Sequence, residues 1–212
     1  MLTWWRDHEL GDCPAVVGKR IARALIEQRQ LEHKHAGIFV LHELLADHLR
    51  AADLGGFEQL FAAGHLNDPS IVDAFALRVL GALLHRVRGR AEVARALAQW
   101  RTADTIWQRR AACVGFTALA PQGETALPGL GQLVLSTCAT VVWSHERFDQ
   151  TAVGWVLREL SRAEPARVDA FVTRYARLMS RECVRLAVER LPRHEELLAH
   201  HRRCTTLKRR PR

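Results

Sequence analysis

The chain has 212 residues, 48% of them hydrophobic, so it is long enough for one folded domain and too apolar to be disordered. Lys and Arg number 31 against 23 Asp and Glu, and the formal charge of +8 favours a polyanionic partner. The longest apolar runs fall short of the roughly 20 residues that cross a bilayer, so we expect no membrane segment.

The cysteines and histidines favour a reducing compartment and argue against a metal site. The five cysteines are odd in number and never form a CxxC pair, which is typical of reduced thiols in a cytoplasmic protein. The start, MLTWWRDHELGD, lacks a cationic segment followed by an apolar one, so we expect no secretory signal. The nearest ligand-like spacings, His33-x-His35 and His200-His201-x-x-Cys204, match no known zinc pattern, and we predict no metal site.

Helix signals follow one another along the chain. Helices are predicted over 14–29, 31–50 and 56–64, and Trp4 and Trp5 are expected to cover the end of the array. Asn67-Asp68-Pro69 is a strong start signal, since Asp68 can cap a helix whose first turn tolerates proline. That helix should run to about His85. Further helices are predicted over 91–101, 105–120 with Asp104 as cap, 130–142, 148–163 with Ser144 as cap, 165–179, 181–191 and 193–202.

The spacing of these helices predicts the architecture. Core helices begin near residues 31, 69, 105, 145 and 181, so helix pairs recur about every 36–40 residues. We therefore predict an all-α, HEAT-like repeat α-solenoid of stacked antiparallel helix pairs, with a concave basic face. Residues 1–202 would form this single domain and 203–212 a basic C-terminal tail. An irregular helical bundle is the alternative.

A cluster of arginines marks the middle of the chain. Between His85 and Arg110 the sequence holds seven arginines and two acids, Glu92 and Asp104. Such a run indicates a local basic patch rather than a diffuse excess of charge, as a polyanionic partner would need.

Three residues stand out among apolar neighbours. Asp73 shares a helical stripe with Leu77, Leu80 and Leu84, where an acid is costly. One hairpin later, Arg110 lies among small and apolar residues and needs an anion for its donors. Trp155 lies at the border of the apolar arc that runs from Phe148 to Leu160. If the solenoid is regular, all three face one groove; the alternative is a buried ion pair beside a core tryptophan.

Two stretches resemble a known family. IWQRRAACVGF (106–116) and FDQTAVGWVLRELSRAEPARVDAFV (148–172) resemble helices of the bacterial AlkD-type DNA alkylation repair glycosylases, which are HEAT-like solenoids. The resemblance extends over roughly residues 69–190. It implies hydrolysis of the N-glycosidic bond of cationic N3- and N7-alkylated purines in double-stranded DNA, by a monomer that needs no cofactor.

The resemblance also implies roles for individual residues. Asp73 matches the family's catalytic aspartate, Arg110 its cleft arginine and Trp155 one of its tryptophans. Arg158 matches a further arginine of the family. In the same region we predict Arg109 as another DNA contact and Trp107 as an auxiliary aromatic residue. The family's second tryptophan corresponds here to Pro69, and a family lysine to Ala118.

By this interpretation Asp73 would stabilise positive charge on the deoxyribose and position water. Arg110 would hold a phosphate, and Trp155 would offer an electron-rich face to the cation. Two alternatives remain open: a catalytically weak or inactive HEAT-repeat DNA-binding protein, favoured by Pro69, and a HEAT-type protein-interaction scaffold.

Overall fold

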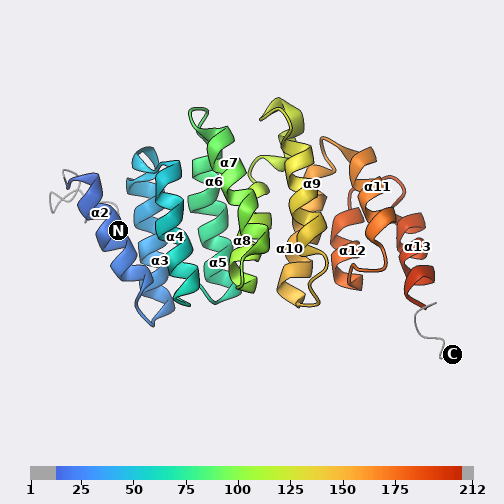
Figure 1. The fold of residues 1–212 in the computed structure, drawn as a ribbon, viewed down its shortest axis with the longest axis horizontal. Helices are drawn as coiled ribbons and strands as arrows, with labels where there is room; N and C mark the ends of the chain where they lie inside the picture. The colour runs from blue at the N-terminus through green and yellow to red at the C-terminus, as the bar shows by residue number, and fades with distance from the viewer. Residues whose placement is uncertain (1–12, 207–212) are drawn as a thin grey trace.

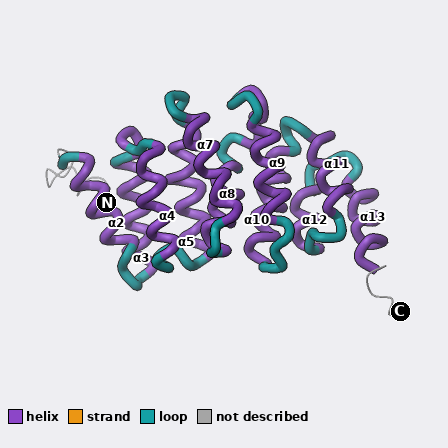
Figure 2. Tube along the Cα trace, viewed as in Figure 1, coloured by secondary structure: helices purple, strands orange, loops and turns teal. Residues whose placement is uncertain are grey.

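The structure is a computed structural model that describes residues 13–206. Within that range every regular element is a helix, which confirms the predicted all-α class. The helices lie side by side in one extended array, from α2 (Ala15–Ile26) at one end to α13 (His194–Thr206) at the other (Figure 1). Figure 2 shows that only short loops join them. This is the helical-repeat solenoid that the 36–40-residue spacing predicts.

The array is built from α-helices interrupted by short π and 3-10 segments. In chain order after α2 these are α3 (Leu31–Phe39), η2 (Val40–Leu44), η3 (Ala46–His48), η4 (Ala51–Asp53), α4 (Leu54–Ala62), α5 (Pro69–Phe75), η5 (Ala76–Leu80), α6 (Gly81–His85), α7 (Arg90–Gln99), η6 (Trp100–Thr102), α8 (Ile106–Phe116), η7 (Ala120–Thr125), α9 (Leu130–Val141), α10 (Arg147–Leu160), α11 (Pro165–Tyr175) and α12 (Arg181–Val188), before α13.

One row of helices carries the residues of interest. Helix α3 contacts α5, α5 contacts α8, α8 contacts α10, and α10 contacts α12, so alternate helices form a continuous layer, which we call the α8 row. On its other side α4 contacts α7 and α7 contacts α9. Residues Asp73, Arg110 and Trp155, about one repeat apart in sequence, therefore stand on neighbouring helices of one layer.

The start signal at Asp68 is confirmed. The Asp68 carboxylate accepts hydrogen bonds from the backbone N–H groups of Ser70 and Ile71, and Pro69 occupies the first helical turn. Hydrogen bonding to Ser70 outweighs the opposing effect of burial and lowers the pKa of Asp68. The helix that opens here runs without a break through α5, η5 and α6 to His85, as predicted.

The π segment η5 changes how this helix presents its side chains. A π turn takes an extra residue, so side chains beyond it do not keep the angles of an α-helix. Leu80 and Leu84 are fully buried, whereas Leu77 is 41% exposed. The predicted stripe of Asp73, Leu77, Leu80 and Leu84 is therefore not uniformly internal, and Asp73 lies at its solvent border.

Several predicted details need correction. The cap of α8 is Thr105, whose hydroxyl accepts from the Gln108 N–H, and not Asp104. Helix α10 begins after Glu146, and Ser144 instead accepts from the Glu146 N–H in the preceding turn. Helix α13 continues through residues 203–206, so the predicted tail is partly helical. Trp4, Trp5 and residues 207–212 lie outside the described residues.

Three of the cysteines belong to the core. The side chains of Cys113, Cys138 and Cys183 are fully buried, and all five cysteines are unpaired. Burial, together with the neighbouring Cys113 thiol, raises the pKa of Cys138 far above its ordinary value. Thiols in this state behave as small apolar groups that fill the core.

The described part of the chain lacks two kinds of feature. Within residues 13–206 no helix is both long and apolar enough to cross a membrane. The same residues contain no group of three His, Cys, Asp or Glu side chains placed to hold a metal ion.

The contact between α10 and α12 generates a stability prediction. A Cβ added at Gly154 would lie 2.7 Å from the Cys183 carbonyl oxygen and 3.0 Å from the Leu186 Cβ. Gly154→Ala should therefore force these helices apart and lower the free energy of unfolding by roughly 1–3 kcal/mol in urea titration. Gly55→Ala is the matched control: that site has no atom within 4 Å. Higher helix propensity should leave this variant as stable as the parent or up to about 1 kcal/mol more stable. Equal losses in the two variants would contradict the close packing at Gly154.

Candidate functional site

An ion pair between neighbouring helices lies at the centre of the candidate site. Arg110 of α8 donates from Nε to Asp73 Oδ1 and from Nη2 to Asp73 Oδ2, both at 2.7 Å. Such two-point pairing fixes both the distance and the plane of the carboxylate. Arg110 is only 6% exposed, whereas the Asp73 side chain is 23% exposed. The pair is thus anchored in the protein on the arginine side and open to solvent on the aspartate side.

A third helix completes this arrangement. Arg110 Nη1 donates to the Phe148 carbonyl oxygen at 2.9 Å and to Thr151 Oγ1 at 3.0 Å, both on α10. Four of the five guanidinium hydrogens therefore have partners inside the protein. The role predicted for Arg110, holding a DNA phosphate, does not fit these contacts. The arginine instead holds Asp73 in place.

Aromatic rings lie beside the pair. The Phe148 ring centroid is 4.9 Å from that of Trp107, and the Arg110 Cζ lies 5.7 Å from the Phe148 centroid. Arg147 Cζ lies 5.9 Å from the same ring. Trp107, predicted only as an auxiliary aromatic, therefore packs against the ring that lies beside Arg110. The sequence places Phe148 in the apolar arc of α10 and gives it no role in the site. Its position in the first turn of the helix, where fewer neighbours cover a side chain, is the signal that could have indicated its partial exposure.

Trp155 and Arg158 share a face of α10 with Thr151. They follow Thr151 by four and seven residues, and residues at that spacing lie on one side of an α-helix. Because Thr151 touches Arg110, this side is turned towards the ion pair. Trp155 is partly buried, as its border position predicts. The sequence-predicted Asp73, Arg110 and Trp155 thus lie on three successive elements of the α8 row.

Acids restrain Arg158. It donates to Glu159 at 3.1 Å and to Glu189 at 3.4 Å, and Glu159 also accepts from Arg190 at 2.7 Å. Burial would raise the pKa of the Glu159 carboxyl, but the hydrogen bonds and charges of Arg190 and Arg158 prevail and hold its pKa below the ordinary value. Arg158 is therefore held in place on the surface of α10.

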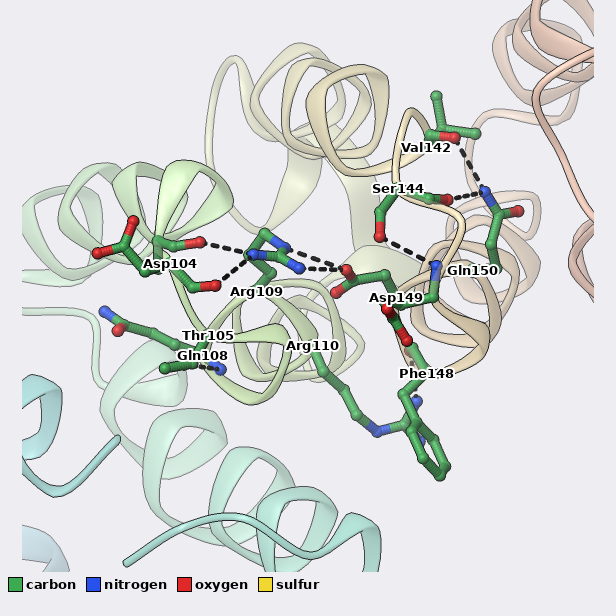
Figure 3. A network of polar contacts seen from close by, with 12 residues as sticks. Asp104, Thr105, Gln108, Arg109, Arg110, Val142, Ser144, Phe148, Asp149 and Gln150 are labelled. Atoms are coloured by element: carbon green, nitrogen blue, oxygen red, sulfur yellow. Dashed lines mark hydrogen bonds and ion pairs between the residues drawn. The ribbon is translucent and has the colours of Figure 1, made fainter. Parts of the chain in front are cut away.

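Arg109 points elsewhere. Its guanidinium binds the fully buried Asp149 and the carbonyl oxygens of Ala103 and Asp104 (Figure 3). Its predicted role as a DNA contact is therefore replaced by a bridge between α10 and the loop before α8. The physical reason is that consecutive residues of a helix point about 100° apart, so Arg109 and Arg110 cannot share a face.

Part of the central arginine run is also engaged internally. Arg86 donates to the Ala46 carbonyl, Arg101 to the Ala98 carbonyl, and Arg90 to the carbonyls of Leu84, His85 and Ala126. These arginines join loops and helix ends. Fewer of the seven arginines are therefore free to bind a partner than the sequence alone indicates. Two other tryptophans of this region have different surroundings: Trp100 is buried and donates a hydrogen bond to Glu58, and Trp143 is 64% exposed in the turn before α10.

The Glu159 contacts generate a prediction of pH dependence. Because the folded-state pKa is lowered, the carboxylate stabilises the fold above its unfolded pKa of about 4.3, and this stabilisation is lost as the pH falls through the folded value. Glu159→Gln should therefore be less stable than the parent at neutral pH. The difference in the free energy of unfolding should shrink as the pH falls below that value, and urea titrations across the acid range would measure it. A constant difference would contradict the lowered pKa.

Comparison with known proteins agrees with the resemblance of the two helices. No curated protein sequence matches the chain. A family described as DNA alkylation repair enzyme matches residues 4–191, which include every element of the α8 row and each predicted site residue. Membership indicates a role in the repair of alkylated DNA, with DNA as the partner. The chain belongs to the DNA alkylation repair enzyme family.

Proposed function

We propose that the protein is a DNA glycosylase that releases cationic N3- and N7-alkylated purines from duplex DNA. The observation that carries this proposal is the Asp73 carboxylate, held at two points by Arg110 and exposed on one side. A fixed anion open to a ligand is suited to stabilise positive charge that develops on a bound sugar. The family supports the same reaction class, since repair of alkylated DNA can begin with loss of the damaged base.

The chemistry requires little acid catalysis. An alkylated purine already carries a positive charge, so the C1′–N bond can break with its electron pair moving to the base, which departs neutral. The deoxyribose then carries the charge as an oxocarbenium ion. Asp73 would stabilise this ion and orient the water that adds to C1′, accepting the proton that this water releases. Arg110 contributes by keeping the carboxylate in a fixed position before the reaction begins.

The aromatic rings give the cation a second partner. Phe148 lies beside Arg110 and contacts Trp107, and Trp155 lies on the same side of α10 as Thr151, which contacts Arg110. The faces of such rings attract cations, most strongly for tryptophan. By the resemblance, Pro69 takes the place of a family tryptophan, and Trp107 and Phe148 are other aromatic rings near Arg110. Together with the net charge of +8, these groups suit a charged base in a polyanionic duplex.

A second candidate is a DNA-binding protein of this family that does not cleave. The observation that favours it is that both Asp73 oxygens already accept hydrogen bonds from Arg110. The resemblance also implies that Pro69 replaces a family tryptophan. This candidate predicts binding to duplex DNA that weakens steeply with salt, without release of a base. A protein-interaction scaffold predicts neither.

The test compares the parent with Asp73→Asn on duplex DNA carrying 7-methylguanine. Asn has the size of Asp without its charge, so the rate of base release should fall by about 100-fold or more. The affinity for undamaged duplex should change by less than about threefold, because phosphate contacts dominate binding. Chromatography of the freed base and fluorescence anisotropy measure the two quantities.

Asp47→Asn serves as the matched control, since it makes the same change at a fully exposed side chain on η3, outside the α8 row. It should leave base release unchanged. Unchanged release in Asp73→Asn would refute the assigned role. A parent that binds duplex but frees no base would establish the second candidate instead.

A further inference from the structure

We infer that Asp149 and Arg109 form a positioning device for the Asp73 carboxylate. This inference rests on the proposed function, because it concerns the group to which catalysis is assigned. Neither residue belongs to the Asp73–Arg110 cluster, and Asp149 is 0% exposed. It therefore acts through other residues and not on DNA.

The contacts define a second bridge between the same two helices. Arg109 Nε and Nη2 donate to Asp149 Oδ2 at 3.0 and 2.7 Å. Arg109 Nη1 donates to the carbonyl oxygens of Ala103 and Asp104 at 2.7 and 2.9 Å. In Figure 3 Arg109 lies between the Asp104 loop and Asp149, while Arg110 extends towards Phe148. The Asp149–Arg109 pair thus connects α10 to α8, and Arg109 extends the connection to the loop that leads into α8.

Sequence adjacency couples this bridge to the candidate site. Arg109 and Arg110 are consecutive in α8, and Phe148 and Asp149 are consecutive in α10. The Phe148 carbonyl that accepts from Arg110 belongs to the peptide unit joined to the Asp149 nitrogen. Because that unit is planar and stiff, a shift of the Asp149 backbone moves the Phe148 oxygen with it. Arg110 would follow, and Asp73 with Arg110.

The cost of the bridge argues that it does more than hold the fold together. A fully buried ion pair can be replaced by apolar residues of similar volume with little loss of stability. Asp149 also leaves its Oδ1 atom buried without a hydrogen-bond partner among the described residues, which adds a desolvation cost. Stability alone does not account for a buried ion pair at this place. The need for directional bonds that set the position of α10 against α8 does account for it.

The neighbouring Gln150 provides a contrast. It is 2% exposed and donates to the carbonyls of Val142 and Ser144, while its own oxygen accepts from the Ser180 N–H. Gln150 thus fixes the first turn of α10 against the preceding turn and α12. Asp149 fixes the same turn against α8, where Arg110 originates.

Single-turnover kinetics on duplex DNA with 7-methylguanine test the inference. Asp149→Asn should lower the maximal rate of base release by about 10- to 100-fold, since displacements near 1 Å carry costs of this size. The concentration at half-maximal rate and the affinity for duplex should stay the same. In an Asp73→Asn background the Asp149→Asn change should add almost nothing, because both act through the same carboxylate.

Two further variants separate positioning from stability. The double variant Arg109→Met with Asp149→Leu removes both charges and should restore the stability lost in Asp149→Asn without restoring the rate. Arg90→Met, which breaks an internal bridge to Leu84, His85 and Ala126, is the matched control and should leave the rate per folded molecule unchanged. Recovery of the parental rate in the double variant would overturn the inference.

A measurement independent of activity distinguishes this inference from the proposed function. Hydrogen exchange of the Arg110 Nε–H, followed by nuclear magnetic resonance, should become faster in Asp149→Asn and remain slow in Arg90→Met. Faster exchange in a protein that never releases a base would leave the positioning intact and reject the proposed function. Unchanged exchange in an active enzyme would reject the positioning.

Discussion

The arrangement of the candidate site depends on one guanidinium group shared by three helices. Arg110 of α8 reaches Asp73 on α5 in one direction and Phe148 and Thr151 on α10 in the other. A nearly buried cation is stable only with an anion and well-placed acceptors, so these helices cannot shift independently without leaving a donor unsatisfied. Solenoid packing makes the helices neighbours, and this cation sets their register.

The proposed chemistry benefits from that rigidity. In a repeat array each helix pair contacts only its neighbours, so a site on its surface lacks the enclosing walls of a globular pocket. The ion pair supplies in its place a carboxylate whose orientation is set before any ligand arrives, with the Phe148 ring beside its arginine partner. A substrate that brings its own positive charge suits such an open surface, because it needs electrostatic support and not proton donation from a buried acid.

The sequence predicted the architecture well because the helix signals are local. The period of the helix pairs and the Asp68-Pro69 start depend on residues close together in the chain, and both are found as predicted. The site was predicted less completely. Asp73 and Arg110 stood out as charges among apolar neighbours, and their pairing is the ion pair that the sequence offered as the alternative to a shared groove. Asp149 gave no signal, because its partner Arg109 is 40 residues away. Arg109 was predicted as a DNA contact because neither its distant carboxylate partner nor its backbone acceptors can be identified from the sequence around it.

The π turns have a consequence for any comparison between repeats of this array. Segment η2 starts at Val40 and η5 at Ala76, a separation of 36 residues (76 − 40), so two successive repeats carry the same irregularity about one repeat apart. The next helix of the row, α8, is described as α-helical throughout. An alignment of the repeats that ignores this difference would assign the wrong direction around the helix axis to every side chain after Phe75. A one-residue gap at that point restores the match between inward-facing positions.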